Sequence, residues 1–238
     1  MTTAQNVIQS LRNIASPEIA EHSFRFFKAG PDEYAEGDKF LGIRVPEQLK
    51  IARKNSQLPL SEIHKLLQSK YHEIRLTGLF ILVYQYEKAD PSRQKEIFQF
   101  YMENLDRVNN WDLVDSSAKY IAGHFLFDKD RSVLYKLADS ENLWERRVSV
   151  LTTFYFIDQG DFSTTLDICE KLLNDDEDLI HKATGWMLRE IGKKEKQVLT
   201  QFLDKHSKNM PRTMLRYAIE KLPENERQGY LKGEGIRN

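Results

Sequence analysis

One pattern recurs along the chain at nearly regular intervals, and it restricts the fold more than any other feature. Four segments each begin after a polar turn, place a basic residue early and continue with small or apolar residues; they start near Tyr71, Trp144, Ile180 and Pro211. They lie about 72, 36 and 33 residues apart, and the segment around Trp111 fills the gap in the first interval. A repeat of about 36 residues has the length of a stacked helix pair. The pattern therefore predicts an all-α protein, an α-solenoid of helix pairs with a concave groove.

The rest of the chain agrees with this interpretation. Nearly every segment shows helical spacing, and convincing strand alternation is absent. All seven prolines fall at expected helix starts or in connections, and Pro17, Pro46 and Pro91 resemble first-turn prolines that follow helix caps. The repeat length lies between those of TPR and HEAT motifs, and we describe the repeats as HEAT-like. Because no linker of distinct composition interrupts the series, we predict a single domain over residues 1–238.

Composition limits the class of protein. The 238 residues are 40% hydrophobic and 30% charged, which is typical of a globular protein with a substantial core. Basic and acidic residues nearly cancel, 35 against 36, so bulk charge argues neither for nor against a nucleic-acid partner. The one cysteine, Cys169, is expected to be a buried inert thiol, which favours a reducing compartment. No signal-like segment or membrane-spanning apolar run occurs, so we expect a cytoplasmic protein with no membrane contact.

Several common kinds of site can be set aside. The six histidines include no pair spaced three or four residues apart, which disfavours a helical zinc site. The glycines do not form a phosphate-binding loop, and no nucleophile elbow is present. We therefore expect no metal and no cofactor. What remains is chemistry supplied by carboxylates, cations and aromatic faces.

The stretch 109–117 concentrates such groups. Trp111 and Asp115 are four residues apart, so ring and carboxylate share one face of a helix. An aromatic wall beside a fixed negative charge stabilises a cation, either a ligand or a charge that develops during reaction. Asp112 has a structural explanation near the helix start, where the helix dipole favours a carboxylate by about 0.3–1 kcal/mol. Trp111 is explained about equally well as a core residue and as the aromatic partner of Asp115.

A second set of candidates lies further along the chain. Lys182, Trp186 and Arg189 form a basic and aromatic helix face separate from the apolar core stripe. Arg147 is suited to grip a phosphate through two hydrogen bonds, and we prefer it to its neighbour Arg146. Alternatively, Trp186 shields a neighbouring helix from solvent. Arg146 and Arg147 would then be a solvated pair of charges. The residues expected on the concave surface are Arg75, Trp111, Asp115, Arg147, Lys182, Trp186 and Arg216.

Glycines and one long connection are also informative. Gly78, Gly123 and Gly185 fall inside expected helices, at a cost of about 1 kcal/mol each relative to alanine. Tight helix packing explains these glycines, and close approach of a rigid polymer is the functional alternative.

The connection 29–42 is long enough to have a function or to be mobile. The alternative is that aromatic side chains such as Phe40 pin it to the body of the protein.

Four motifs, in this order, resemble those of one family. They are Phe40-Leu41-Gly42-Ile43-Arg44-Val45-Pro46, Trp111-Asp112-Leu113-Val114-Asp115, Trp144-x-x-Arg147 and the segment from Lys182 to Glu190. The chain thus resembles the AlkD-type DNA alkylation repair glycosylases from about residue 24 to 221. The resemblance implies HEAT-like repeats whose basic concave surface wraps duplex DNA. It also implies removal of N3- and N7-alkylated purines by cleavage of the N-glycosidic bond, which the best-studied type achieves without flipping the lesion into a pocket.

The resemblance also implies roles for single residues. Asp115 would be the catalytic carboxylate, while Trp111 and Trp186 would stand beside the deoxyribose of the lesion. Arg147 would hold the phosphate backbone. A cationic alkylpurine is already a good leaving group, and a carboxylate with indole rings stabilises the positive charge that grows on the sugar. We therefore expect a monofunctional DNA N-glycosylase, a hydrolase that acts as a monomer on duplex DNA containing alkylated purines. Phosphate contacts are expected from Arg75, Lys119, Arg147, Lys182, Arg189 and Arg216.

Departures from the family pattern leave alternatives open. Asn110 stands where some members carry a second tryptophan, and residues 30–39 form a longer loop. These differences leave open which adducts are preferred and whether bulky adducts are accepted.

Two other functions stay open. One is a non-catalytic HEAT-repeat protein that binds DNA, and the other is a protein-interaction scaffold, the commonest use of α-solenoids. The near-zero net charge is compatible with a scaffold, whereas intact Asp115 and Arg147 favour the enzyme.

Overall fold

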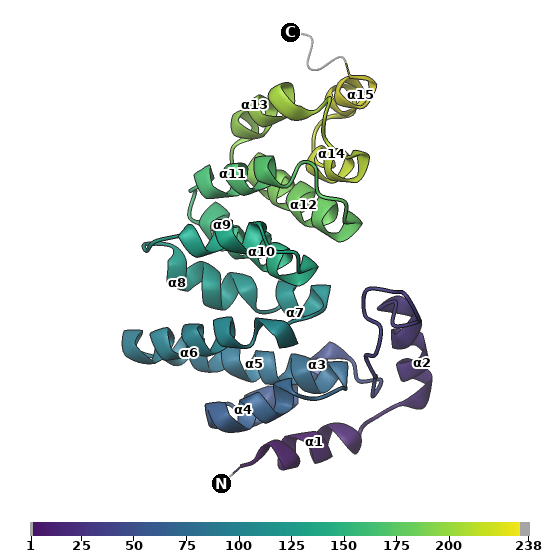
Figure 1. Cartoon of the computed structure of the whole chain (residues 1–238), viewed down its shortest axis with the longest axis vertical. Helices are drawn as coiled ribbons and strands as arrows, with labels where there is room; N and C mark the ends of the chain where they lie inside the picture. Colours follow the sequence, from purple (N-terminus) through teal and green to yellow (C-terminus); the bar gives the residue numbers. More distant parts are fainter. Residues whose placement is uncertain (1, 234–238) are drawn as a thin grey trace. The chain divides into compact units, whose positions relative to one another are not determined.

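The computed structural model describes residues 2–233 and confirms the predicted all-α class (Figure 1). Within these residues the backbone forms helices joined mostly by short turns, with one long connection between α2 and α3, and the only β-type pairing is an isolated bridge between Lys39 and Tyr71. Over the same residues, none of the helices combines the length and the apolar character needed to cross a membrane. The chain divides into two compact units, Met1–Ile121 and Ala122–Asn238, which we describe separately. The single domain expected from the sequence stays a prediction.

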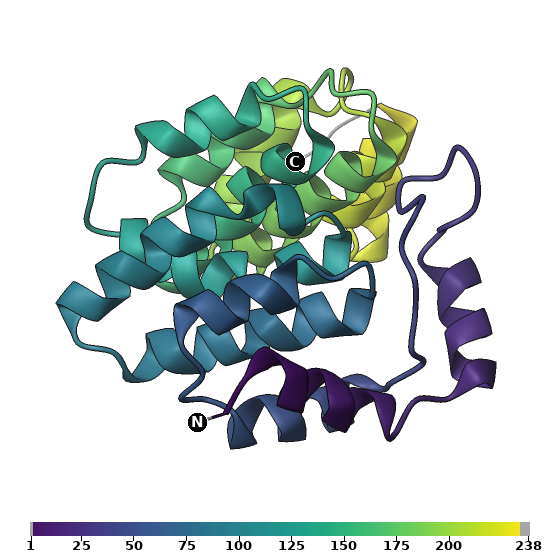
Figure 2. The same ribbon diagram turned by 60° about the horizontal axis from the view of Figure 1, so that its bottom comes forward.

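Unit 1 is built around one long helix. Its elements are α1 (Ala4–Arg12), α2 (Pro17–Phe26), α3 (Val45–Lys54), α4 (Leu60–Leu67), α5 (His72–Lys88), α6 (Pro91–Glu103), the 3₁₀ turn η1 (Leu105–Arg107) and α7 (Trp111–Asp115). Helix α5 packs against α3, α4, α6 and α7 (Figure 2). It is buried on nearly every side, and its buried residues include the charged side chains of its first turn as well as apolar ones. A π-helical segment, η2 (Lys119–Gly123), follows α7.

The helix starts confirm the predicted caps before Pro17 and Pro91, whereas Pro46 lies in the first turn of α3 behind Arg44, whose side chain makes no cap hydrogen bond. Ser16 and Asp90 are the residues that cap α2 and α6, and each side chain accepts a hydrogen bond from a backbone N–H of the first turn. A proline follows each cap directly, where its missing N–H costs nothing. Pro59, Pro211 and Pro223 each stand immediately before a helix.

Unit 2 continues the succession of helix pairs. Its helices are α8 (His124–Leu126), α9 (Ser132–Ala138), α10 (Leu143–Asp158), α11 (Ser163–Lys171), α12 (Asp178–Lys194), α13 (Lys196–His206), α14 (Arg212–Ala218) and α15 (Glu224–Lys232). Helix α10 packs against α9, α11 and α12, and α12 packs in turn against α13 and α14. Helices α5, α10, α12 and α14 begin in the four segments that share the sequence pattern. The recurring unit is therefore a helix pair, as in an α-solenoid.

The contact between α12 and α14 depends on a glycine. A Cβ atom on Gly185 would lie 2.5 Å from the carbonyl oxygen of Met214 and 2.6 Å from the Cβ of Tyr217. Gly123 is similarly close to Thr152, whose carbonyl oxygen would lie 2.6 Å from an added Cβ. Tight helix packing therefore accounts for both glycines. Cys169 is fully buried in the core of this unit, and burial raises the pKa of its thiol, as expected of an inert cysteine.

Replacing Gly185 by alanine should therefore destabilise unit 2. The added methyl group would force α12 and α14 apart, and overpacking of this kind typically costs about 1–3 kcal/mol of unfolding free energy. Gly78→Ala is the matched control, because there the nearest atom to the added Cβ is a leucine side-chain carbon at 3.2 Å. Urea denaturation should show a clear loss for Gly185→Ala and a much smaller change for Gly78→Ala. Equal stability of the two variants would contradict this packing argument.

Candidate active site

Helix α7 carries the predicted carboxylate and indole. Its cap is Asn110, which is fully buried and accepts a hydrogen bond of 2.8 Å from the backbone N–H of Trp111 through its side-chain oxygen. Leu113 and Val114 are buried and attach the helix to unit 1. Trp111 and Asp115 are half-buried and line the same cavity, so they share one side of the helix as their spacing predicts.

This cavity has a volume of about 400 Å³ and lies within unit 1. Helices α3, α5 and α7 contribute its walls, together with Tyr120 of η2. Its aromatic side chains are Phe80, Tyr84, Trp111 and Tyr120. Its carboxylates are Glu87, Asp112 and Asp115. The arrangement combines aromatic faces with negative charge, which is the chemistry that binds a cation.

A buried tyrosine lies close to the candidate carboxylate. Tyr101 of α6 shares a hydrogen bond of 3.0 Å with the hydroxyl of Ser117, which in turn donates to the carbonyl oxygen of Leu113. Burial raises the pKa of Tyr101, the hydrogen bond to Ser117 lowers it, and the negative charge of Asp115 raises it further. Tyr101 therefore stays protonated beside Asp115, a neighbour that the sequence did not indicate.

Aromatic rings hold Trp111 from the side of α2. Phe27 stacks on the indole with ring centroids 5.3 Å apart, and Phe26 meets it edge-on at 5.9 Å. Phe27 also stacks on Phe40, at 5.4 Å. Since Phe40 belongs to the connection 29–42, these contacts attach that connection to unit 1. Such attachment by aromatic side chains is the sequence-based alternative to a functional or mobile loop. Phe26 is 57% exposed, so this aromatic cluster reaches the surface beside Trp111.

A buried charge network fixes the start of α7. His72 of α5 is 1% exposed, and its Nε2 lies 2.8 Å from the carboxylate of Asp112. Its Nδ1 lies 3.4 Å from the carboxylate of Asp38, which also accepts hydrogen bonds of 2.8 Å from Arg75. Burial lowers the pKa of His72, but the carboxylates of Asp112 and Asp38 together outweigh it, and the pKa is raised to about 9. His72 is therefore protonated at neutral pH, and Asp112 is neutralised by it.

This network changes the assignment of one predicted DNA contact. Arg75 is 1% exposed, and it binds Asp38 and the carbonyl oxygen of Ser69. Turning this guanidinium toward a phosphate would leave the buried carboxylate of Asp38 without its partner, which is costly. The structure gives Arg75 a role inside unit 1, and we leave it out of the proposed DNA-binding set.

The motif at the end of the long connection also has a structural role. The buried carboxylate of Glu73 accepts backbone hydrogen bonds from Leu41, Gly42 and Ile43, at 2.9, 2.8 and 3.3 Å. Gly42 has φ +76°, and an added Cβ would lie 2.0 Å from the carbonyl oxygen of Ser16. Only glycine fits at this position. The Phe-Leu-Gly-Ile segment is thus a docking point for the connection.

The remaining predicted residues are found in both units. Lys119 of unit 1 is half-buried, with its ammonium 6.0 Å from the centre of the Tyr120 ring. In unit 2, Trp186 is half-buried and off the buried stripe of α12, as predicted; its Nε1 donates a hydrogen bond of 3.0 Å to Glu190. Arg147 is buried on α10 and donates to the carbonyl oxygen of Leu179 at 2.7 Å.

The other basic candidates of unit 2 differ in exposure. Lys182 forms an ion pair of 2.6 Å with Asp178. Arg189 is paired with Glu220, and its side chain is 17% exposed. Arg216 of α14 is exposed. Trp111 and Asp115 are thus brought together in unit 1, whereas Trp186, Lys182 and Arg189 lie along α12 of unit 2. That the two groups act on one ligand stays a prediction.

Together, the helix pairs and the cavity that Asp115 lines with four aromatic side chains define a helical-repeat protein with an acidic, aromatic cavity. The sequence matches the family model of the DNA alkylation repair enzymes over residues 7–222. The chain therefore belongs to this family, which confirms the predicted resemblance. Membership makes DNA the partner and repair of alkylation damage the role.

Solved structures share the fold. One, described as a "predicted DNA alkylation repair enzyme from Enterococcus faecalis", is 18% identical, with a TM-score of 0.69 over 88% of this chain and 97% of that one. A second, a crystal structure of a protein from Streptococcus mutans, is also 18% identical, with a TM-score of 0.51 over 91% of this chain and 96% of that one. No curated protein matches the sequence.

The charge of His72 should make the stability of unit 1 depend on pH. The pKa is raised to about 9 in the folded protein, from about 6.5 for an exposed histidine. The stabilisation by His72 is therefore complete below about pH 6.5 and is lost as the pH rises through 9, at about 1.4 kcal/mol per unit of pKa difference. The urea midpoint of the wild-type protein should fall over this interval. His72→Asn should be less stable at pH 6 and should lack this decline; an unchanged pH profile in the variant would assign the decline to other groups.

Proposed function

We propose that the protein is a monofunctional DNA glycosylase that excises cationic N3- and N7-alkylated purines from duplex DNA. The observation that carries the proposal is the placement of Asp115 and Trp111 on one cavity that further aromatic and acidic side chains also line. When the N-glycosidic bond breaks, the alkylated base leaves with the bonding electrons and positive charge develops on the deoxyribose. A carboxylate and an aromatic face that already point at this position stabilise the charge without rearranging.

Between the two carboxylates of α7, the environment favours Asp115 as the catalytic group. Asp112 is bound to the protonated His72 at 2.8 Å, so its charge is already compensated inside the protein. Asp115 lies one turn further along and lines the cavity together with Trp111. In this proposal Asp115 stabilises the oxocarbenium ion and orients the water that attacks the sugar. Trp111, held by its stacking on Phe27, faces the developing cation.

Affinity for DNA would come from basic side chains that contact the phosphate backbone. We propose that these are Lys119, Arg147, Lys182, Arg189 and Arg216, with Trp186 as a second aromatic wall beside the sugar. Arg216 is exposed, which suits a backbone contact. Lys182 is paired with Asp178, and Arg189 is paired with Glu220. On binding DNA, a phosphate group would replace each of these carboxylates. Such contacts carry no sequence preference.

Substitution of the carboxylate tests the proposed reaction. Asp115→Asn should lower the rate at which 7-methylguanine is released from methylated duplex DNA by at least about 10²-fold, the usual effect of losing one such electrostatic group. Binding to the same duplex should change little. Asp128→Asn is the matched control, because this carboxylate is 76% exposed, is paired with Lys129 and does not line the cavity; it should leave the excision rate near the wild-type value. If Asp115→Asn still releases the base at the wild-type rate, Asp115 is not part of the mechanism.

Salt dependence tests the proposed phosphate contacts. Arg216→Gln should weaken binding to all duplex sequences alike, and it should reduce the slope of log K against log salt concentration by about 1. Lys205→Gln removes the same charge from α13, at a side chain that is 65% exposed and paired with Glu170. This control should leave both affinity and slope near the wild-type values. Identical slopes for Arg216→Gln and the wild type would exclude Arg216 from the interface.

A further inference from the structure

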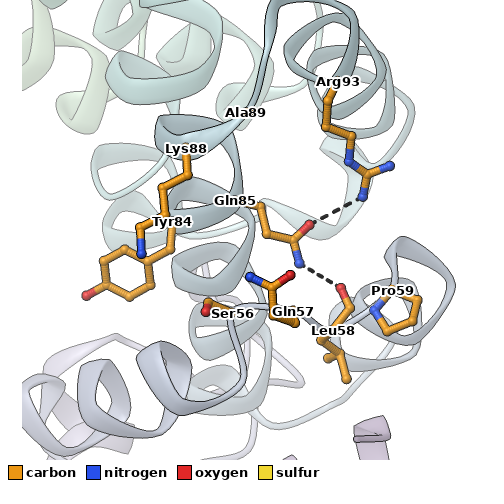
Figure 3. A pocket seen from close by; sticks show the side chains of 9 residues that line it. All are labelled: Ser56, Gln57, Leu58, Pro59, Tyr84, Gln85, Lys88, Ala89 and Arg93. Carbon is orange, nitrogen blue, oxygen red and sulfur yellow. Dashed lines mark hydrogen bonds between the residues drawn. The ribbon is translucent and has the colours of Figure 1, made fainter. Parts of the chain in front are cut away.

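Next to the candidate active site, unit 1 contains a second pocket of opposite charge. It has a volume of about 220 Å³ and lies where the connection between α3 and α4 meets the turn from α5 to α6 (Figure 3). The two cavities share one lining residue, Tyr84. Three carboxylates line the larger cavity, and none of its described lining residues is basic. Lys88 and Arg93 line the smaller pocket, and none of its described lining residues is acidic.

One glutamine holds the two sides of the smaller pocket together. The amide nitrogen of Gln85 donates a hydrogen bond of 2.6 Å to the carbonyl oxygen of Leu58, and its amide oxygen accepts one of 3.4 Å from Arg93. Figure 3 shows both bonds. Because Gln85 belongs to α5, around which unit 1 is built, these bonds attach the connection between α3 and α4 to that helix. The pocket is therefore part of the folded unit.

The side chains that line this pocket have hydrogen-bond donors to spare. Within residues 2–233, the ammonium of Lys88 forms no ion pair, and the side chains of Ser56 and Gln57 form no hydrogen bond. The guanidinium of Arg93 uses two of its five N–H donors in bonds to neighbouring side chains. These groups can all donate to an anion, and Lys88 and Arg93 add positive charge.

A third cation stands at the residue that the two cavities share. The Nε of Arg53 donates a hydrogen bond of 3.0 Å to the hydroxyl oxygen of Tyr84, and its guanidinium carbon lies 5.6 Å from the centre of the ring. Arg53 is exposed, and it forms no ion pair with any described residue. Lys88 follows Tyr84 by one turn on the same face of α5. Positive charge therefore gathers where the pocket adjoins the cavity of Asp115.

The volume and the charge of the pocket suit one anionic group of a larger ligand. Sites that enclose a whole small molecule measure about 300–1,000 Å³, which is more than the 220 Å³ of this pocket. Lysine and arginine side chains bind phosphate oxygens through charge-assisted hydrogen bonds, which are stronger than neutral ones. A phosphate group that enters the pocket while the rest of its molecule stays outside satisfies both conditions.

We infer that this basic pocket binds a phosphate of the DNA backbone beside the site of reaction, an inference that rests on the proposed function. Each strand of a duplex carries one phosphate per about 3.4 Å of helix axis. A duplex whose damaged nucleotide faces Asp115 therefore presents further phosphates close by, and the two sites share Tyr84. Lys88 and Arg93 thereby join the residues that hold the DNA, and they contact the backbone rather than the lesion.

Binding to undamaged duplex tests the pocket without catalysis. Lys88→Gln should weaken binding about eightfold at 0.1 M salt and reduce the slope of log K against log salt concentration by about 1, because one phosphate contact contributes about 0.9 to that slope. Lys95→Gln is the matched control, since Lys95 is an exposed lysine of α6 that also forms no ion pair with a described residue and does not line the pocket. It should bind like the wild type. Equal losses in the two variants, or none in either, would overturn the inference.

A negative charge placed in the pocket gives a second, independent test. Gln57→Glu should weaken duplex binding by at least about tenfold, because a carboxylate repels the phosphate that Lys88 attracts. Gln57 is exposed and forms no side-chain hydrogen bond with a described residue, so the urea midpoint should stay near the wild-type value. Gln99→Glu adds the same charge at an exposed position of α6 outside the pocket and should bind nearly normally. Wild-type affinity of Gln57→Glu would contradict the assignment.

Excision kinetics separate a backbone contact from a part in the reaction. With methylated duplex, Lys88→Gln should raise the DNA concentration that gives half the maximal rate and leave the maximal rate near that of the wild type. A lower maximal rate with unchanged affinity would overturn the inference. If the wild-type enzyme releases no alkylated base, the proposed function fails, and the measurements on undamaged duplex still decide whether the pocket binds a backbone phosphate.

A free phosphate ion is the other source of the same chemistry. Inorganic phosphate is added at constant ionic strength, and the melting temperature is measured for the wild type and for Lys88→Gln. Both should respond alike, because a single ion lacks the other contacts by which a duplex holds its phosphate in the pocket. If phosphate stabilises only the wild type while both proteins bind duplex equally well, the pocket takes a free phosphate and the inference is overturned.

Discussion

A chain of four buried charges determines where the candidate active site lies. Asp112, His72, Asp38 and Arg75 alternate in sign and connect α7, α5 and the long connection before α3. A buried charge without its partner is costly, so each member of the chain requires the next. Since α7 is only five residues long, its own hydrogen bonds cannot fix its direction. The position of Trp111 and Asp115 therefore depends on contacts made by residues far away in the sequence.

The two carboxylates of α7 show how environment separates chemically identical groups. Asp112 is compensated by a histidine that is protonated only because two carboxylates surround it. Asp115 instead lines the cavity next to rings and a neutral phenol. Asp112 thus has a structural role, and the proposed function assigns the chemistry to Asp115, a division that recurs in enzymes with paired acids. Phe27 stacks on the indole of Trp111 and on the ring of Phe40, so the indole too is held by residues distant in the sequence.

The sequence predicted features that depend on neighbours along one helix. The helix pairs, the proline-marked helix starts and the shared face of Trp111 and Asp115 all follow from local spacing. Arg75 was expected on the concave surface, but α5 is buried on nearly every side and its periodicity does not reveal which face reaches solvent. The partners of His72 and Glu73 lie 30 to 40 residues away in the sequence, and no local pattern links them. Tyr101 was missed for the same reason.

The burial of Cys169 has a consequence for a protein of this family. Alkylating agents that damage DNA also react with protein nucleophiles, and a cysteine thiolate is among the most reactive of these. The only sulfhydryl of the chain lies fully inside the core of unit 2, and its raised pKa keeps it in the less reactive protonated form. The enzyme therefore carries no exposed soft nucleophile of this type. Its single thiol is thus shielded from the electrophiles whose lesions the family repairs.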